Sequence, residues 1–322
     1  MRKLIGVIVA LALAWAGFWA YARGQLDKAQ QTWLAGKLDA GWQIDLSDRS
    51  IAGFPNRLDS TSRDLVVAPP DRTWEWRAPF LQVLALVYQP NHVIVVWPDQ
   101  QTIAMDGETF TLDSQDLRAS VVRKSDRDLD RLTIQGKGLR IQARGEPGIW
   151  YARTLTASAR QLPGGDAQMA LDIQGLTGRE DDSTPGPEDG ATLQLDMTYH
   201  LTAPLVADLG LGLDQAAPEG ATLHRAVLSW QGLRATAKGK IMRDSAGYAS
   251  GQIDLDITGW SDGMTALDSL QGEQAKNAKT LIGLLAVVAA FSGDANKLRV
   301  PLRFEGGQMF LGNLPVGEAP KI

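Results

Sequence analysis

The first apolar segment of the chain is long and uninterrupted. Residues 4–22 contain no charged residue and no proline, and they follow the basic pair Arg2 and Lys3. As a helix rising 1.5 Å per residue, this segment spans about 30 Å, which matches the hydrocarbon core of a bilayer. The basic pair favours a cytoplasmic N-terminus. The pattern predicts a single-pass transmembrane signal anchor in the inner membrane over residues 1–22, with the bulk of the chain in the periplasm.

Aromatic residues gather at the outer end of this segment. Trp15, Trp19 and Tyr21 carry amphipathic rings of the kind that lie at the membrane interface, so they are the candidate interface residues. A cleaved signal peptide is the alternative, because Ala20-Tyr21-Ala22 fits the small-residue pattern of a cleavage site. The bulky Trp19 and Tyr21 disfavour cleavage. Both alternatives export the chain.

A second helix is predicted directly after the anchor, over residues 23–40. Its apolar positions recur at spacings of three and four, as in an amphipathic helix, and Gly41 provides the stop. We expect the anchor helix to continue into this juxtamembrane helix.

From residue 41 onward the hydrophobic period changes to two. Alternating apolar and polar residues are typical of strands with one buried face. The alternation recurs at residues 42–46, 132–134, 193–201, 253–257 and 300–304. Asp244-Ser245-Ala246-Gly247 and Gly306-Gly307 separate such runs, which favours hairpins. The predicted fold class is mainly β with accessory α: an N-terminal transmembrane helix followed by a curved antiparallel β-rich domain covered by one apolar helix.

Residues 178–190 are acidic and rich in proline and glycine, a composition typical of a solvated loop. We expect this loop to join two halves of one periplasmic β-rich domain that covers residues 41–322. Two separate domains are the alternative, since loops of this length occur in both settings.

The exported part contains one long helical pattern, at residues 273–291. Its first turns are polar, the run from Leu281 to Phe291 is apolar, and Gly293 ends it. The apolar run is too short to span a membrane, so we expect this helix to pack on the sheet. It either belongs to the core or forms a plug that an acyl chain displaces.

The apolar helix and the alternating strands together define a candidate hydrophobic groove. Its lining comes from the apolar faces of two strands and from the helix. The candidate residues are Leu193, Leu195, Met197, Tyr199, Ile253, Leu255, Ile257, Leu281, Leu284, Leu285 and Val288.

Composition and charge exclude several classes of protein. The chain has 322 residues, of which 37 are acidic and 32 basic, and its net charge of −5 argues against a nucleic-acid partner, which requires a basic surface. The chain contains no cysteine, so thiolate zinc sites, iron–sulfur clusters and cysteine nucleophiles are excluded. We expect no cofactor.

The sequence also lacks the usual motifs of catalysis and metal binding. His92, His200 and His224 are widely spaced, so none belongs to a close pair of metal ligands, and His200 is expected to be a solvated residue on the polar face of its strand. The acidic run at residues 126–130 resembles a calcium loop but lacks the glycine and the final glutamate of such a loop. No nucleotide-binding or serine-hydrolase signature occurs. We therefore expect no catalytic site, no metal site and no enzymatic activity.

The tripeptide Gly53-Phe54-Pro55 predicts a tight structural turn. Glycine supplies backbone freedom, and proline fixes φ and ends strand pairing. We expect Phe54 to insert into the core as an anchor.

Three stretches of the sequence together resemble one family. They are Gly41-Trp42 with residues 51–58, residues 76–80 with residues 88–92, and the C-terminal residues 304–320. In this combination the chain is similar to an uncharacterised alphaproteobacterial envelope family, defined only as a domain of unknown function. The resemblance runs over nearly the whole chain and implies an envelope location without a mechanism. The anchor, the Gly-Phe-Pro turn and the hairpins are more distantly similar to AsmA-like envelope proteins, which hold lipid in β-rich grooves.

Two functions from different classes fit these features. The first is a protein that binds or guides a lipid or another hydrophobic ligand in maintenance of the cell envelope. The second is a ligand-free structural or adaptor module that recruits other envelope proteins through a sheet edge or through its tryptophan-rich N-terminal half. Lipid bound by the folded protein favours the first function, and reproducible protein partners without lipid favour the second.

Overall fold

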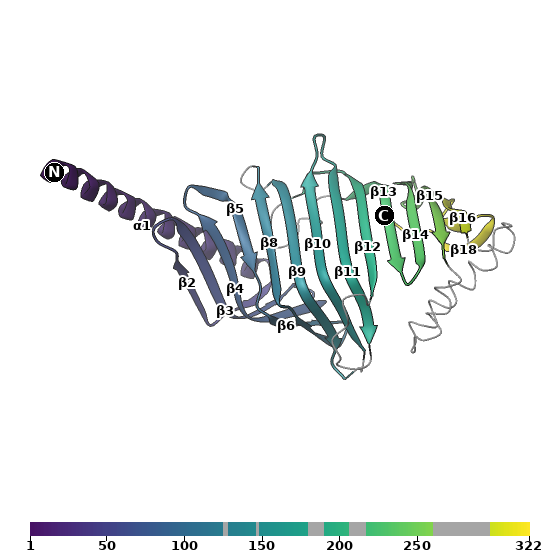
Figure 1. The fold of residues 1–322 in the computed structure, drawn as a ribbon, viewed down its shortest axis with the longest axis horizontal. Coiled ribbons are helices and arrows are strands. Elements are labelled where there is room, and N and C mark those ends of the chain that lie inside the picture. Colours follow the sequence, from purple (N-terminus) through teal and green to yellow (C-terminus); the bar gives the residue numbers. More distant parts are fainter. Residues whose placement is uncertain (125–127, 146–147, 180–189, 206–216, 260–296) are drawn as a thin grey trace. The chain divides into compact units, whose positions relative to one another are not determined.

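The computed structural model describes residues 1–124, 128–145, 148–179, 190–205, 217–259 and 297–322. In these residues one long helix precedes a series of antiparallel strands (Figure 1). The predicted fold class is thereby confirmed as mainly antiparallel β with an N-terminal apolar helix. The predicted covering helix of residues 273–291 and most of the acidic loop of residues 178–190 lie outside the described residues.

The chain divides into two compact units. Unit 1 contains Met1–Asp126, Ile134–Trp150 and Gly178–Asp182, and unit 2 contains Arg127–Thr133, Tyr151–Thr177 and Ser183–Ile322. The chain passes from one unit to the other within three strands, which are β9 (Leu129–Ala143), β10 (Ile149–Gln161) and β11 (Ala167–Arg179).

Helix α1 (Arg2–Asp39) is continuous through the predicted anchor and the predicted juxtamembrane segment, so the expected continuation of the anchor helix is confirmed. The helix is long and apolar enough to cross a membrane once. Its side chains up to Ala14 are exposed, and its N-terminal half extends away from the strands of unit 1 (Figure 1). The helix ends just before Gly41, whose φ of +86° is a conformation that glycine adopts without strain.

The strands of unit 1 are organised around β3 (Arg57–Ala68) and β4 (Trp74–Leu86). One end of β3 pairs with β1 and the other with β2. The N-terminal end of β4 pairs with β6 and continues through β7 to β9, whereas its C-terminal end pairs with β5 and continues to β8. The sheet of unit 1 therefore forks at β4. Its remaining strands are β1 (Gln43–Asp45), β2 (Asp48–Ala52), β5 (Gln89–Val96), β6 (Gln100–Met105), β7 (Glu108–Asp113) and β8 (Asp116–Arg123).

From Trp15 onward, α1 contacts the strands and turns of unit 1. Asp27 of the helix forms an ion pair with Arg49 of β2 (Oδ1 to Nη2, 2.5 Å), and Gln30 donates a hydrogen bond of 2.9 Å to the hydroxyl of Ser60 in β3. The apolar contact joins Trp19, Ala22 and Leu26 of the helix to a buried cluster of Ile51, Leu58 and Val87. Of the apolar positions in the predicted helix of residues 23–40, Leu26 takes part in this contact, whereas Ala29, Trp33 and Leu38 are exposed.

The Gly53-Phe54-Pro55 segment forms the predicted turn, between β2 and β3. Gly53 has a φ of +105°, and a Cβ atom at this position would lie 2.8 Å from the Cβ of Arg57, so only glycine fits without displacement. The expectation that Phe54 inserts into the core is wrong, because the residue is 58% exposed. Trp19 of α1 packs on the buried cluster instead, and the ring of Phe54 stacks edge-on against its outer side, with centroids 5.5 Å apart.

Unit 2 contains an antiparallel meander in which each strand from β11 to β18 pairs with the next. The alternating runs at residues 193–201, 253–257 and 300–304 are confirmed as strands β12, β15 and β16. The bounds are β12 (Ala191–Leu201), β13 (Pro218–Trp230), β14 (Leu233–Arg243), β15 (Ala249–Thr258), β16 (Lys297–Glu305), β17 (Gln308–Leu311) and β18 (Leu314–Glu318).

Both predicted hairpin turns of unit 2 are confirmed. Between β14 and β15, the carboxylate of Asp244 accepts hydrogen bonds from the backbone N–H groups of Ala246 (2.9 Å) and Tyr248 (2.8 Å). Between β16 and β17, Gly306 and Gly307 both have positive φ, at +60° and +76°. An aspartate that bonds its own turn and two glycines with positive φ are standard solutions to a tight reversal.

Candidate hydrophobic binding face

Strands β11 to β16 place apolar side chains on one face of their sheet. In an antiparallel sheet, residues directly opposite each other on neighbouring strands share a face. The pairing puts Leu195 of β12 opposite Ala226 of β13, and Leu255 of β15 opposite Val300 of β16. Following the pairing from strand to strand gives continuous rows of apolar residues across all six strands, which lie side by side (Figure 1).

Four such rows make up what we call the apolar face. Strands about 4.8 Å apart and rows about 6.7 Å apart give a face of roughly 24 Å by 20 Å. In the order β11 to β16, the rows are Ile173, Leu193, Leu228, Ala235, Ile257, Leu298; Leu171, Leu195, Ala226, Ala237, Leu255, Val300; Met169, Met197, Leu223, Gly239, Ile253, Leu302; and Ala167, Tyr199, Ala221, Ile241, Gly251, Phe304.

The opposite face of the same strands is polar. Gln194 donates a hydrogen bond of 2.9 Å to the carboxylate of Asp172, and Arg299 donates one of 2.8 Å to Asp256. A sheet with one polar and one apolar face presents its polar side to water and needs a cover on the other side. Two rows of the polar face, in which the buried Val227 is the one apolar residue, are Asp172, Gln194, Val227, Thr236, Asp256, Arg299 and Gln168, Thr198, Thr222, Lys240, Gln252, Arg303.

The structure brings the two predicted strands of the groove onto this one face. Strand β12 carries Leu193, Leu195, Met197 and Tyr199, and β15 carries Ile253, Leu255 and Ile257. Two strands, β13 and β14, separate them, which corresponds to about 14 Å. Ile257 is buried and the other six are half-buried. The four remaining groove candidates, Leu281, Leu284, Leu285 and Val288, lie outside the described residues.

The sequence did not reveal the residues between β12 and β15. Alanine and glycine occupy much of β13 and β14 on the apolar face, and such small side chains contribute little to a hydrophobic alternation. Their place became visible only through the strand pairing. They are Ala221, Ala226, Ala235, Ala237 and Gly239.

The chain itself packs the apolar face at its β16 side. Ile257, Leu298 and Val300 form a buried cluster with Leu311 of β17, and Val316 of β18 lies against it. The last hairpin thus provides part of the core of unit 2.

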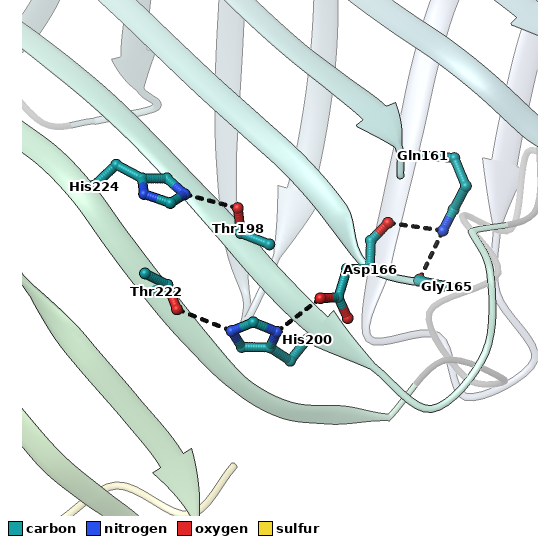
Figure 2. Close-up of polar contacts among 7 residues, drawn as sticks. All are labelled: Gln161, Gly165, Asp166, Thr198, His200, Thr222 and His224. Atoms are coloured by element: carbon teal, nitrogen blue, oxygen red, sulfur yellow. Dashed lines mark hydrogen bonds and ion pairs between the residues drawn. The ribbon is translucent and has the colours of Figure 1, made fainter. Parts of the chain in front are cut away.

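A polar cluster lies on the other face, at the end of β12 (Figure 2). The Nδ1 atom of His200 is 2.8 Å from the carboxylate of Asp166, and its Nε2 atom is 2.9 Å from the hydroxyl of Thr222. The His200 side chain is 22% exposed, so it is held between two partners, in contrast to the solvated histidine that the sequence predicted. The strand pairing causes the difference, because it brings Thr222 next to His200 from a neighbouring strand.

Gln161 fixes the turn that presents Asp166. Its side-chain amide donates to the backbone carbonyls of Gly165 (2.6 Å) and Asp166 (2.9 Å), as Figure 2 shows, while its carbonyl oxygen accepts from the backbone N–H of Leu205 (2.8 Å). Figure 2 also shows His224 bonded to Thr198 on the same face, at 2.8 Å. The cluster links the β10–β11 turn to β12 and β13.

His200 lies between the carboxylate of Asp166 and the hydroxyl of Thr222. An acid, a base and a hydroxyl group bonded in this order also occur in sites of nucleophilic catalysis. Such catalysis also requires donors for the developing oxyanion and a cavity for the substrate. Two open hollows, of about 430 and 210 Å³, are lined by residues of unit 1, among them Thr102, Thr109 and Arg144. We interpret the cluster of unit 2 as a link between strands.

In the described part of the chain, no group of three or more histidine, aspartate and glutamate side chains is arranged to hold a metal ion. His92 bonds the hydroxyl of Ser120, with Nε2 2.9 Å from Oγ. All three histidines of the sequence therefore bond side chains of neighbouring strands, and His200 also bonds Asp166 of the β10–β11 turn.

Two of the three predicted interface residues contact the β2–β3 turn. The indole N–H of Trp15 donates to the backbone carbonyl of Pro55 (2.9 Å), and that of Trp19 donates to the carbonyl of Arg57 (2.8 Å). Tyr21 is exposed. The tryptophan N–H groups are thus bonded within the protein.

These observations define a class of protein: a mainly antiparallel β protein with one apolar sheet face and one N-terminal helix that is long and apolar enough to span a membrane. Residues 19–320 match the model of a family described as uncharacterized proteins conserved in bacteria (DUF2125), and the chain belongs to this family. The resemblance to a family of unknown function is therefore confirmed. No curated protein and no solved structure matches the chain.

Proposed function

We propose that this protein is anchored in the inner membrane by the first part of α1, with its β-rich part in the periplasm, and that it binds or guides a lipid or another hydrophobic ligand on the apolar face of unit 2. The observation that carries the proposal is the continuity of four apolar rows across six strands, with polar rows on the other side. A ligand with a long hydrocarbon chain matches such a surface because hydrophobic contact is non-directional and grows with the apolar area removed from water.

The orientation in the membrane rests on charge. Arg2 and Lys3 precede the apolar part of α1, and basic residues favour the cytoplasmic side of a span. Residues 41–322 then follow on the periplasmic side, where lipids move between the two membranes of the envelope.

The small residues of β13 and β14 support a ligand on this face. Ala226 and Ala237 stand between Leu195 and Leu255 in the same row. Short side chains between larger ones leave room for a chain that lies across the strands, and the larger residues contact its flanks.

Binding without chemical conversion is the activity that we propose. The polar cluster around His200 consists of side chains bonded to one another across strands, which is the arrangement of a structural link. A carrier of hydrophobic ligands needs neither a nucleophile nor a metal ion.

Photo-crosslinking in intact cells tests the proposal on the full chain. A photoreactive phenylalanine analogue replaces Leu195 or Ile253 on the apolar face, and matched controls carry it at the neighbouring polar-face positions Gln194 and Asp254, both of which are exposed. We expect lipid adducts by mass spectrometry at Leu195 and Ile253 and none at the two controls. Equal lipid labelling at all four positions, or no lipid adduct at any of them, would overturn the proposal. Adducts with a defined protein at the apolar face would support the adaptor function instead.

A further inference from the structure

The contact between α1 and unit 1 begins inside the apolar part of the helix. Trp15 and Trp19 donate hydrogen bonds to the carbonyls of Pro55 and Arg57, and both tryptophans precede Arg23, the first charged residue after the apolar segment. At 1.5 Å per residue, Trp19 lies about 6 Å and Trp15 about 12 Å below the level of Arg23 along the helix axis. The β2–β3 turn therefore follows the helix toward the membrane.

A complete span by α1 has to include helix residues that contact unit 1. The free residues from Leu4 to Ala14 cover only about 16 Å, which is roughly half of a hydrocarbon core of about 30 Å. The rest of the span has to include residues 15–22, and these are the residues that begin to contact unit 1.

A second turn lies beside the first and shares its character. The backbone N–H of Val87, between β4 and β5, donates a hydrogen bond of 3.0 Å to the carbonyl of Asn56. Each turn exposes an aromatic ring: Phe54 is 58% exposed and Tyr88 is 64% exposed. Residues 53–56 and 87–91 carry no charge.

Four backbone carbonyls in and next to the β2–β3 turn accept hydrogen bonds from groups of the protein. The carbonyl of Gly53 accepts a hydrogen bond from the backbone N–H of Arg57, and that of Asn56 accepts one from the backbone N–H of Val87. The carbonyls of Pro55 and Arg57 accept hydrogen bonds from the indole N–H groups of Trp15 and Trp19. Proline has no backbone N–H to satisfy. A turn that faces water has no need for such pairing, whereas a turn in the acyl region requires it, because no water is present to bond the carbonyls.

Charged groups border the two turns. Arg57 follows the first turn and pairs with Asp59 (Nη2 to Oδ2, 3.0 Å), and the guanidinium of Arg23 lies 6.0 Å from the centre of the Trp19 ring. Arginine side chains at this level are suited to the phosphates of lipid headgroups.

We infer that the turns at residues 53–56 and 87–88, with the first residues of β5, form a membrane-facing edge of unit 1, which enters the outer leaflet of the bilayer that α1 spans, with Phe54 and Tyr88 in the interfacial and upper acyl region. The occupant of this edge is the phospholipid bilayer itself. The inference rests on the membrane anchoring in the proposed function and is independent of any ligand on the apolar face.

Depth-dependent quenching tests this inference on the full chain, which has no native cysteine. Single variants Phe54→Cys, Tyr88→Cys, Val9→Cys and Glu108→Cys are labelled with an environment-sensitive fluorophore and reconstituted into phosphatidylethanolamine–phosphatidylglycerol vesicles. Val9 reports on the anchor. Glu108 is the water-facing control. It lies in β7, which pairs with β6, and β6 pairs with the N-terminal end of β4. That end is about 40 Å along β4 from the turn at Tyr88.

We expect nitroxide-labelled lipids to quench the labels at positions 54 and 88 at least about twofold more than the label at position 108, with quenching by aqueous iodide in the reverse order. Labels at 54 and 88 that behave like position 108, while position 9 is quenched by lipid, would overturn the inference and leave the anchor intact. Absence of lipid quenching at position 9 would overturn both the anchor and the inference.

Discussion

The indole nitrogen of Trp19 lies 2.8 Å from the backbone carbonyl oxygen of Arg57, so a side chain from the apolar part of α1 completes the hydrogen bonding of a β-turn in unit 1. The same ring packs on the buried cluster of Ile51, Leu58 and Val87 and stacks against Phe54. The helix is therefore a structural part of unit 1 as well as the candidate membrane span.

Replacement of Trp19 by phenylalanine removes the donor and leaves the Arg57 carbonyl unpaired. We expect Trp19→Phe to lower the free energy of unfolding by about 0.5–1.5 kcal/mol, which is the usual net contribution of one hydrogen bond to stability. Denaturant unfolding of the full chain in detergent micelles measures the change. The matched control is Tyr21→Phe at an exposed position of the same helix, for which we expect a change within about 0.5 kcal/mol. Equal effects of the two substitutions would contradict this role of Trp19.

Gly53 and Gly107 both have positive φ, at +105° and +82°, but only Gly53 lies close to other atoms. A Cβ atom at Gly53 would be 2.8 Å from the carbonyl oxygen of Arg57, whereas nothing lies within 4 Å of one at Gly107. We expect Gly53→Ala to destabilise the protein by at least about 1 kcal/mol more than Gly107→Ala, since both share the backbone strain and only the first adds a clash. Thermal unfolding of the two variants side by side gives the difference, and indistinguishable melting temperatures would show that the turn is not as close to the strand as described.

The link through His200 is expected to matter for stability. His200→Leu removes the bonds to Asp166 and Thr222, so we expect a loss of about 1–3 kcal/mol of unfolding free energy in unit 2. His224→Leu serves as the control, because His224 is exposed and bonds only Thr198 among the contacts described here, and we expect a smaller loss. Lipid capture at Leu195 should persist in folded His200→Leu protein, whereas its loss would assign the histidine a role in ligand binding.

The periodicity of the sequence predicted the elements well where one face of an element is strongly apolar. The period of three and four over residues 23–40 corresponds to the second half of α1, and the period of two at residues 193–201 and 253–257 corresponds to β12 and β15. These patterns follow directly from the geometry of helices and strands.

Pairing between strands could not be derived in the same way. Alternation assigns Leu195 and Leu255 to apolar faces of their strands but does not tell which strands lie between them, and the alanines of β13 and β14 leave little signal. Pairing also decides the surroundings of His200, which depend on a threonine from β13.

The position of Phe54 shows a further limit of reasoning from local sequence. Gly53 and Pro55 correctly predict a turn, because they act through their own backbone. The surroundings of Phe54 depend on Trp19, which is distant in the sequence, packs against the buried cluster beside the turn and contacts the ring of Phe54.

The apolar face of unit 2 is the centre of the proposed function, and a substitution that makes it polar should remove bound ligand. Leu195 and Met197 are half-buried on β12, outside the cluster that β17 and β18 pack. We expect Leu195→Gln/Met197→Gln to weaken the binding of an acyl chain, because two amide groups on the face lose hydration without gaining a partner when a hydrocarbon covers them. Thr192→Gln, which places one amide group on the polar face of the same strand, is the matched control.

The most direct measurement is native mass spectrometry, with lipid extraction, of the full chain purified from membranes and exchanged extensively into a lipid-free mimetic. We expect about one lipid or other hydrophobic molecule to stay bound to the wild-type protein and to Thr192→Gln, and to be lost from folded Leu195→Gln/Met197→Gln. A wild-type protein that is folded and free of ligand, or a double variant that retains the same ligand in the same amount, would contradict binding at the apolar face.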